Sequence, residues 1–447
     1  MSSGSPATSR TRLALLLFAL SLAVYLASPI RIQTDSLWTI PTAASLWREG
    51  NADLDEYGPA LDRSPYGIET VQGRRMSFFP LAVSWVALPC VVLVDAVVHV
   101  ARSSSLALPS SVERLAQRWE RDFHDTGDID PRGFAWVEQG IASLCTSAAV
   151  ALVFVACAEL ASLPAAFAAA LCFAFGTSAY SAASRVLWQH GPGLLFLSAA
   201  LWLALRLRRE TGGRAACAAL GACIAGACVL RPLHALSALA LAALVLRTRV
   251  AALGWIALGA AAIAVPFALH AWSLHGEPLP PYFHPWRLSA RGGDFGAALL
   301  GQSFSPARGL FVYSPVLLLA WLHGAKRAAL QRDDAWIAAA VLVPLAYALA
   351  TAAYPHWWGG HGYGPRLSCD ALPWLALLLA SAVDAVRSAP RARAARALLC
   401  GALALVGVLL HARGALSIEP HHWSSMPSDV DRAPERLWDW SDPPFLR

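Results

Sequence analysis

A carboxylate stands just beyond the first apolar segment of the chain. Asp35 follows the apolar run 13–30, in the stretch T-D-S-L-W (34–38). A carboxylate at the mouth of a membrane helix is costly to hold in lipid, and it usually faces a water-filled cavity or a partner. Such a group can also take a proton from an attacking hydroxyl. Asp35 is therefore a candidate functional residue, expected at the bottom of an extracytoplasmic cavity.

A glycine-rich loop later in the chain is suited to hold an anion. Its sequence is Y-P-H-W-W-G-G-H-G-Y-G-P-R (354–366), and it contains His361, Tyr363 and, at the mouth of the next apolar run, Arg366. Backbone N–H groups and a guanidinium could bind phosphate there. The aromatic rings offer flat faces for a sugar or an isoprenoid chain. The alternative is an aromatic belt at the membrane interface with turn glycines.

Two further loops carry candidate donor-binding residues. Arg308 lies in S-F-S-P-A-R-G-L-F-V-Y-S-P (303–315), and Arg185 and His190 lie in S-R-V-L-W-Q-H-G-P (184–192). Phosphate binding by Arg308 competes with a positioning or snorkelling role. A lone histidine outside the membrane is more often solvated than catalytic. Arg185 is taken as a phosphate ligand and His190 as a secondary or acceptor-side residue.

The loop after the first apolar run contains charged residues that we assign to the acceptor side. They are Asp53, Asp55, Glu56 and Arg74. Oxygen ligands of this kind could bind a divalent cation. A solvated acidic loop explains them better, because acidic clusters are common on surfaces. The sequence therefore predicts no metal and no other cofactor.

Composition indicates an all-α, polytopic membrane bundle. The 447 residues are 57% hydrophobic and 14% charged, with a mean hydropathy of +0.48. Soluble domains average nearer a quarter charged. Basic residues do not interleave with aromatics in the pattern of a nucleic-acid surface. The nine cysteines lie mostly within apolar runs, which favours small buried residues over disulfides or metal sites.

The apolar runs predict about 11 crossings, within a range of 10 to 13. Arg10 and Arg12 place the N-terminus (1–12) on the cytoplasmic side of a bacterial-type inner membrane. The bundle then covers 13–411, with a first extracytoplasmic loop at 31–138 and an extracytoplasmic tail at 412–447.

Within the first extracytoplasmic loop, 38–49 and 112–123 are expected to form amphipathic helices. The run 78–100 carries Asp95, His99 and two prolines, and we expect it not to cross cleanly. The alternative is 12 crossings. The runs counted as crossings are 13–30, 141–160, 165–180, 193–207, 215–229, 233–246, 251–272, 310–322, 335–353, 371–386 and 397–411.

The pattern resembles the GT-C type membrane glycosyltransferases, which include protein O-mannosyltransferases, aminoarabinose transferases and the oligosaccharyltransferase catalytic subunit. The resemblance rests on Asp35 directly after the first span and on the segment T-D-S-L-W-T-I-P-T-A-A-S-L-W-R-E-G (34–50). It also rests on G-R-R-M-S-F-F-P-L (73–81) and on the position of the 184–192 motif. Together these cover most of residues 1–390, although each motif is short.

The resemblance implies an inverting transferase that takes a sugar from a polyprenyl-phosphate donor. Its acceptor would be a hydroxyl of an unidentified glycan, lipid or protein. Asp35 would be the base, and Arg366, Arg308 and Arg185 would neutralise the leaving lipid phosphate. The chain departs from many relatives in having Ser36 after Asp35 and no acid at 184–192.

Two other classes of function stay open at this stage. A transporter or flippase of lipid-linked substrates would place charges near the bilayer midplane and would often show repeats. The apolar runs are nearly free of charge, and no duplication is visible. A non-catalytic membrane scaffold would leave Asp35 without a polar cavity.

Overall fold

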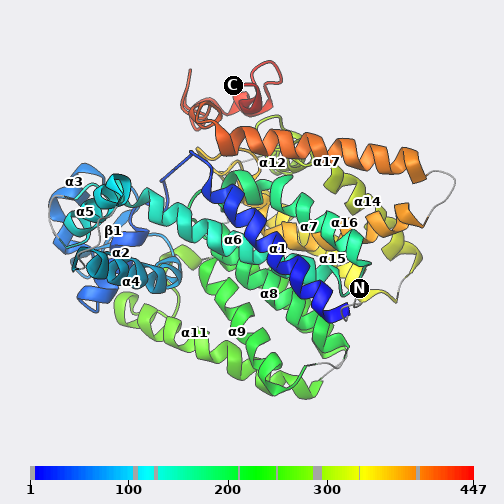
Figure 1. Cartoon of the computed structure of the whole chain (residues 1–447), viewed down its shortest axis with the longest axis horizontal. Helices are drawn as coiled ribbons and strands as arrows, with labels where there is room; N and C mark the ends of the chain where they lie inside the picture. Colours follow the sequence, from blue (N-terminus) through cyan, green and yellow to red (C-terminus); the bar gives the residue numbers. More distant parts are fainter. Residues whose placement is uncertain are drawn as a thin grey trace.

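The computed structural model describes residues 6–103, 109–124, 129–209, 212–247, 250–284, 294–331, 333–388 and 393–447. This part of the chain is a helical bundle with a smaller lobe at one end (Figure 1). Eight of its helices have the length and composition to cross a membrane, and three shorter helices are also apolar. The predicted class, an all-α polytopic membrane bundle, is confirmed, while the number of about 11 crossings stays a prediction. The helices of the bundle are α1 (Pro6–Leu26), α6 (Ala135–Cys157), α7 (Leu163–Phe175), α8 (His190–Arg208), α9 (Arg214–Leu230), α10 (Ala235–Leu246), α11 (Leu253–His275), α12 (Phe295–Phe304), α13 (Leu310–Tyr313), α14 (Pro315–Leu330), α15 (Ala335–Ala352), α16 (Leu372–Arg387) and α17 (Arg393–Leu416).

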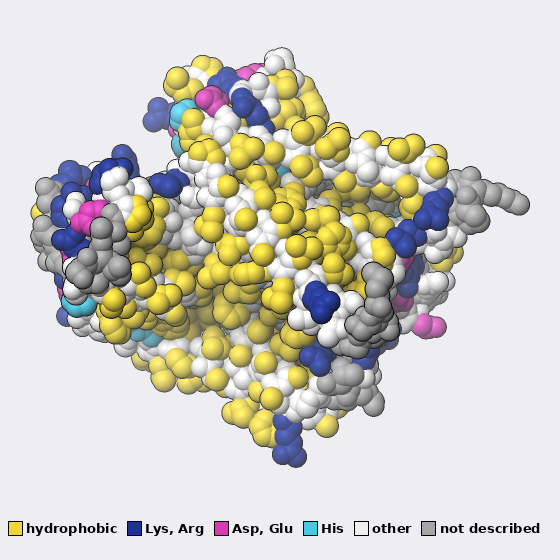
Figure 2. Space-filling model, in the orientation of Figure 1, with side chains coloured by type: hydrophobic (Ala, Val, Ile, Leu, Met, Phe, Trp, Pro, Cys, Tyr) yellow, Lys and Arg dark blue, Asp and Glu magenta, His cyan; other side chains and the backbone are white. Residues whose placement is uncertain are grey.

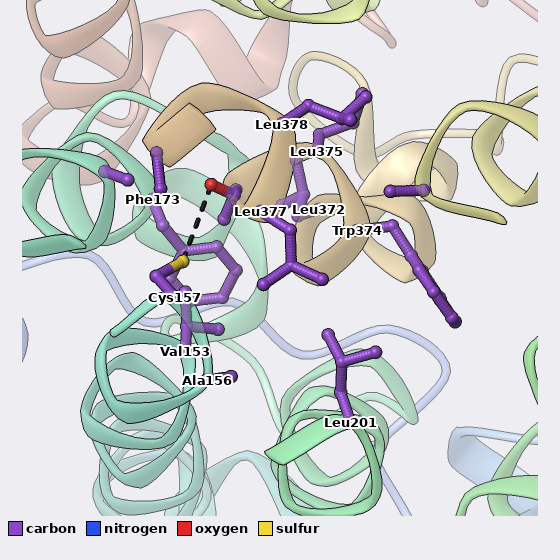
Figure 3. Close-up of a cluster of buried hydrophobic side chains, with 14 of the residues drawn as sticks. Val153, Ala156, Cys157, Phe173, Leu201, Leu372, Trp374, Leu375, Leu377 and Leu378 are labelled. Atoms are coloured by element: carbon purple, nitrogen blue, oxygen red, sulfur yellow. Dashed lines mark hydrogen bonds between the residues drawn. The ribbon is translucent and has the colours of Figure 1, made fainter. Parts of the chain in front are cut away.

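Helix α16 forms the centre of the bundle. Its residues 372–381 are all buried, and they pack against α6, α7 and α14. Figure 3 shows Leu372, Leu375 and Leu377 of α16 meeting Cys157 of α6 and Phe173 of α7. Long apolar helices suit this position because backbone polar groups in a membrane must be paired within the segment. α16 therefore gives the bundle a rigid core, and the loop before α16 carries Arg366.

Helices α9 and α11 pack at very close range. A Cβ atom on Gly221 would lie 1.9 Å from the carbonyl oxygen of Ile256, and one on Gly259 would lie 1.8 Å from that of Ala218. Only glycine permits this approach, which is a common way for membrane helices to associate. The outer face of α11 remains exposed and apolar, as at Leu269. The two helices form an arm beside the core (Figure 1).

Residues of the first loop fold into the lobe at the left of Figure 1. The amphipathic helices expected at 38–49 and 112–123 are confirmed as α2 and α5. α2 differs from a helix on the membrane surface, because residues 39–45 are all buried. A hairpin not expected from the sequence lies between these two helices in the chain, and its turn has positive φ at Gln72 and Gly73. The elements of the lobe are α2 (Thr39–Arg48), α3 (Gly58–Arg63), β1 (Ile68–Val71), β2 (Arg74–Ser77), α4 (Ala82–Ser103) and α5 (Ser110–His124).

Helix α4 contains the segment that the sequence treats as ambiguous. It is one continuous helix of 22 residues despite Pro89, and it is apolar enough to span a membrane. It packs against α2, where the Ser84 hydroxyl donates to the carbonyl oxygen of Thr39 at 3.0 Å. Asp95 accepts a hydrogen bond from the indole of Trp119 in α5 at 3.1 Å. The expectation that 78–100 does not cross stays a prediction.

The surface of the molecule fits a multi-pass membrane protein. Hydrophobic side chains cover the middle of the face seen in Figure 2. Charged side chains gather on the first-loop lobe, on the tail and at the edge opposite the lobe. This distribution is expected when a bundle crosses lipid with both ends in water.

The C-terminal tail (412–447) folds back onto the loops of the bundle. α17 runs to Leu416, five residues beyond its expected end, and α18 (Glu419–His422) follows it. Trp423 is completely buried in a small apolar cluster with Ala307 and Leu437. The indole of Trp423 also donates to the carbonyl oxygen of Asp442 at 2.6 Å. The tail is thus a packed part of the structure.

Candidate functional site

Asp35 lies in a turn between α1 and α2, at the junction of the bundle and the lobe. Its side chain is 18% exposed. The hydroxyl of Tyr66 donates to Asp35 Oδ1 at 2.8 Å. Burial first, and then the charge of Asp35, raises the pKa of Tyr66, so this phenol stays protonated and remains a donor. The turn therefore presents one oriented carboxylate near the surface.

Arg366 approaches Asp35 from the glycine-rich loop. Its Nη1 lies 3.5 Å from Asp35 Oδ2, and its side chain is 13% exposed. The guanidinium covers the indole ring of Trp188 at 4.3 Å from the ring centre. Trp188 in turn donates from Nε1 to the hydroxyl of Thr34 at 3.0 Å. Segments far apart in the sequence thus meet around Asp35.

Asp35 and Trp188 line a cavity between the lobe and α11. The cavity is small, about 50 Å³, and part of it is open to solvent. Its wall is mostly aromatic and aliphatic, with Phe78 and Tyr282 in contact at 5.9 Å between ring centres. Polar lining residues include Gln189 and His270. An apolar pocket with few polar groups suits an amphipathic ligand.

A buried charged network lies close to these residues in the chain, and the sequence analysis missed it. Asp370 is 1% exposed, and its Oδ2 lies 2.7 Å from Arg231 Nε. His190 Nδ1 lies 3.5 Å from Asp370 Oδ1, and His234 Nε2 lies 3.9 Å from the same oxygen. The ring of His234 is also hydrogen-bonded to the hydroxyl of Tyr347 at 3.1 Å.

The network corrects two expectations. His190 is not a solvated loop residue, because it is the first residue of α8 and is 2% exposed. The bundle is also less free of charge than the apolar runs indicate. Arg231 and Asp370 stand at the ends of such runs, where a count of charges within the runs overlooks them. With the runs counted as crossings, residues 230–232 and 367–370 fall on the same side of the membrane, and that is the signal that could have paired them.

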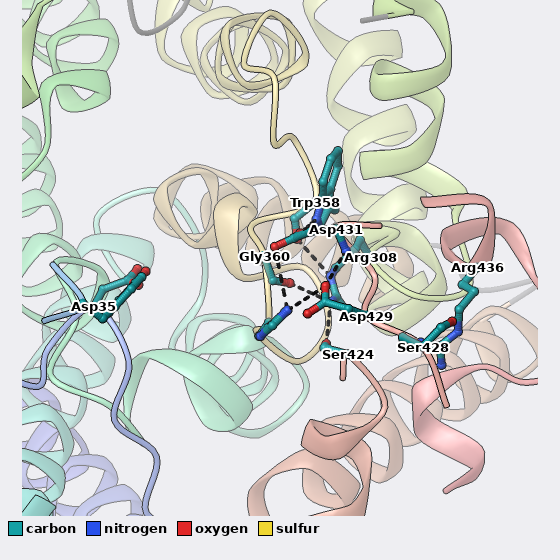
Figure 4. A network of polar contacts seen from close by, with 11 residues as sticks. Asp35, Arg308, Trp358, Gly360, Ser424, Ser428, Asp429, Asp431 and Arg436 are labelled. Atoms are coloured by element: carbon teal, nitrogen blue, oxygen red, sulfur yellow. Dashed lines mark hydrogen bonds and ion pairs between the residues drawn. The ribbon is translucent and has the colours of Figure 1, made fainter. Parts of the chain in front are cut away.

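Arg308 and Tyr363 do not contribute to the Asp35 cavity. The Arg308 guanidinium donates to the carbonyl oxygens of Trp358 at 2.9 Å and Gly360 at 3.0 Å, and to the hydroxyl of Ser424 at 3.0 Å. Tyr363 is buried and donates to the carbonyl oxygen of Leu410 at 2.7 Å. Figure 4 shows the contacts of Arg308 apart from Asp35. The positioning role that the sequence left open for Arg308 matches these contacts.

His361 belongs to the seam between the glycine-rich loop and the tail. Its Nε2 lies 3.2 Å from Asp429 Oδ1 and 3.7 Å from Asp431 Oδ2. Asp431 also accepts from the Trp358 indole at 2.7 Å (Figure 4). Within the described residues, these three ligands form the one group close enough to hold a metal ion. They are at least a third exposed and already paired with one another.

Arg185 is buried away from the cavity. It is 1% exposed, and its guanidinium faces the rings of Tyr25 at 5.7 Å and Tyr180 at 6.0 Å. Burial lowers the pKa of Arg185 to about 10. Arg185 does not line the cavity that contains Asp35.

The charged residues of the first loop pair within the lobe. Asp53 is buried rather than solvated, and it forms an ion pair with Arg74 at 2.5 Å. Asp55 pairs with Arg75 at 3.4 Å, and Glu56 accepts a hydrogen bond from Ser45. Burial raises the pKa of Glu56. These pairs hold the hairpin to α2 and α3, and they do not form a shared cation site.

Comparisons with known proteins give a match through structure alone. A scan against protein families finds no match, and a search of curated proteins finds none. An oligosaccharyltransferase from Archaeoglobus fulgidus, tethered to an acceptor peptide with the NVT sequon, aligns with a TM-score of 0.54 at 13% identity. The alignment covers 95% of this chain and 58% of that one.

Two further solved structures show similar likeness. AglB from the same organism, in complex with an inhibitory peptide and a dolichol-phosphate, aligns with a TM-score of 0.53 at 13% identity, covering 97% of this chain and 60% of AglB. ArnT from Cupriavidus metallidurans, bound to undecaprenyl phosphate, gives 0.49 at 14% identity, covering 93% of this chain and 72% of ArnT. The chain spans less than two thirds of the length of the two archaeal proteins. The chain has the fold of the GT-C type membrane glycosyltransferases.

Proposed function

We propose that the protein transfers a sugar from a polyprenyl-phosphate donor to an acceptor hydroxyl on the extracytoplasmic face of a bacterial-type inner membrane. The observation that carries the proposal is the meeting of Asp35 with Arg366 beside an apolar cavity. The GT-C fold supports it, as does the dolichol-phosphate bound to AglB. The N-terminus, with Arg10 and Arg12, would lie in the cytoplasm.

The chemistry follows from the two charged groups. The acceptor oxygen attacks the anomeric carbon while its proton moves to the Asp35 carboxylate. The bond between that carbon and the phosphate oxygen breaks, and polyprenyl phosphate leaves with the electron pair. Attack opposite the leaving group inverts the anomeric centre. Arg366, whose Nε has no hydrogen-bond partner in the described structure, would stabilise the departing phosphate.

The cavity provides separate surroundings for the lipid and the base. Its apolar wall includes Phe267 of α11, and the outer face of α11 is exposed and apolar. A polyprenyl chain could enter from this side while its phosphate stays near Asp35. The acceptor would reach Asp35 from the open side, near Tyr66. No metal ion or other cofactor takes part in this proposal.

The position of the buried charges favours a transferase over a transporter. A transporter of lipid-linked substrates is expected to use charges near the bilayer midplane. Arg231 follows the last residue of α9, and Asp370 precedes the first turn of α16. The two charges thus lie at helix ends, on the same side of the bundle as Asp35.

Donor consumption in nanodiscs tests the proposal. Wild type, Asp35→Asn and the control Asp62→Asn would receive labelled undecaprenyl-phosphate hexoses and pentoses, with an envelope extract as acceptor. We expect turnover by the wild type and the control, and a fall of about 10²–10⁴-fold in Asp35→Asn. Asp62 suits the control because its side chain is 78% exposed. Undiminished turnover in Asp35→Asn would exclude Asp35 as the base, and inactivity with every donor would favour a scaffold.

A further inference from the structure

The buried network around Asp370 links two chain segments that lie near Asp35 in space. Asp370 is in the short helix 366–371, which begins with Arg366. His190 follows Trp188 by two residues and begins α8. The 3.5 Å contact between His190 and Asp370 therefore joins the segment of Arg366 to the segment of Trp188. Beside the cavity, the same two segments meet again where Arg366 covers Trp188, which lines it.

Arg231 adds a third segment to this junction. It sits between α9 and α10, and besides Asp370 it contacts His190 through Nη1 at 3.3 Å. α9 carries α11, which forms the far wall of the cavity. The pair of Arg231 and Asp370 thus ties the α9–α11 arm to the core below Asp35. The ion pair and its contacts with His190 thus join the segments of Arg366 and Trp188 to the α9–α11 arm.

Stability alone is a weak reason for such a pair. Moving two charges out of water is costly, and replacing a buried ion pair with apolar residues of similar size is often neutral or stabilising. The Arg231 side chain is only 9% exposed and that of Asp370 1%. Geometry is a stronger reason, because a catalytic group misplaced by about 1 Å can cost about a hundredfold in rate.

We infer that Asp370 and Arg231 are positioning residues that hold Arg366 and Trp188 in register with Asp35. Both side chains are almost completely buried and pair with each other, so neither contacts the reacting atoms. They act through the backbone segments 186–190 and 364–370. This inference rests on the proposed transferase function, and it assigns the pair to the geometry around Asp35.

The test separates positioning from stability by comparing single and double variants. Asp370→Leu leaves Arg231 buried without its partner, and we expect it to lower both the unfolding temperature and turnover. Arg231→Met/Asp370→Leu removes both charges, and we expect its unfolding temperature to return close to that of the wild type. For this double variant, kcat/KM for the donor should stay at least about tenfold low.

A matched pair at the opposite end of the bundle provides the control. Arg327 pairs with Asp334 at 2.9 Å. Arg327→Met/Asp334→Asn removes this pair and keeps an acceptor for the backbone N–H of Ile337 at the start of α15. We expect wild-type kcat and KM from it. A double variant of Arg231 and Asp370 that recovers both stability and kcat/KM would overturn the inference.

Amide hydrogen exchange distinguishes failure of the inference from failure of the proposed function. In the double variant, segments 186–190 and 364–370 should exchange faster, while the same segments in the Arg327/Asp334 control should not. This result needs no substrate. If these segments exchange faster in the double variant but the wild type consumes no donor, the transferase function is contradicted and the positioning role is retained. Unchanged exchange in both segments would contradict the positioning role, whatever the activity.

Discussion

Arg366 reaches Asp35 at 3.5 Å while its guanidinium lies over the indole of Trp188, 4.3 Å from the ring centre. The contact joins residues 331 positions apart in the chain. A base and a phosphate ligand so close together can serve one transfer step, because the attacking hydroxyl and the leaving phosphate share a single anomeric carbon. The stacking on Trp188 fixes the plane of the guanidinium before a substrate arrives.

Arg366→Lys is predicted to weaken donor binding. Lysine keeps the charge, but it loses the planar fork for phosphate and the stacking on Trp188. We expect KM for the donor to rise about tenfold, which corresponds to about 1.4 kcal/mol. Steady-state kinetics with a labelled undecaprenyl-phosphate sugar would measure it. Arg132→Lys is the control, since Arg132 is exposed whereas the side chain of Arg366 is mostly buried. An unchanged KM in Arg366→Lys would remove Arg366 as the phosphate ligand.

Tyr66→Phe is predicted to lower kcat without lowering stability. The phenol donates to Asp35 at 2.8 Å, and its loss frees the carboxylate to rotate. Hydrogen bonds to charged groups contribute about 1.5–3 kcal/mol, and Tyr66 is 58% exposed, so a fall of about tenfold in kcat is expected. Kinetics paired with a thermal melt would check it. A lower melting temperature with normal kcat would show that Tyr66 serves the fold and not the base.

Sequence reasoning predicts the bundle well, because apolar length and helical periodicity are local properties. It also places Asp35 and Arg366 at helix mouths on one side of the membrane, which is where they meet. It fails for contacts that depend on tertiary packing. Arg308 and Tyr363 share a glycine-rich context with Arg366, yet their polar atoms bind carbonyl groups of neighbouring segments.

The buried charges are a second example of contacts that sequence reasoning does not find. Asp370 and Arg231 are single charges at the ends of apolar runs, and nothing local distinguishes them from flanking residues. Their pairing depends on α9 and α16 coming together in the fold. The role of Asp35 as a base is a chemical prediction that the contacts favour and that activity has to decide.

Arg308→Lys is predicted to loosen the C-terminal tail. The guanidinium joins Trp358 and Gly360 of the glycine-rich loop to Ser424 of the tail, and an ammonium cannot reach all three. Buried acceptors left unpaired cost about 1–3 kcal/mol, so we expect faster proteolysis within 417–447. Arg432→Lys, at an exposed tail position, is the control. Equal proteolysis rates in Arg308→Lys and the wild type would show that other contacts hold the tail.

Chelation is predicted to leave donor consumption unchanged. In the described part of the chain, the ligands close enough for a metal are His361, Asp429 and Asp431, at the seam with the tail. Asp35 has Tyr66 and Arg366 as its partners instead. Kinetics before and after dialysis against EDTA would test this. If activity is lost and then restored by Zn²⁺ or Mn²⁺, His361→Ala would show whether the seam binds the ion.

Acidification is predicted to release the tail through His421. Burial, with Arg308 nearby, lowers the pKa of His421 to about 4, although its Nε2 donates to the carbonyl oxygen of Gly414 at 2.7 Å. An unfolded histidine has a pKa of about 6.5, so the released tail binds a proton more readily than the docked tail between these values. The docked state is therefore fully favoured above about pH 6.5 and loses stability as the pH falls toward 4.

Proteolysis within 417–447, measured with an acid-tolerant protease from pH 7.5 to 4.5, should accelerate in the wild type as the pH falls. His421→Gln keeps a donor for Gly414 without titrating, and its rate should vary less with pH. An equally steep pH dependence in that variant would assign the effect to other titratable groups.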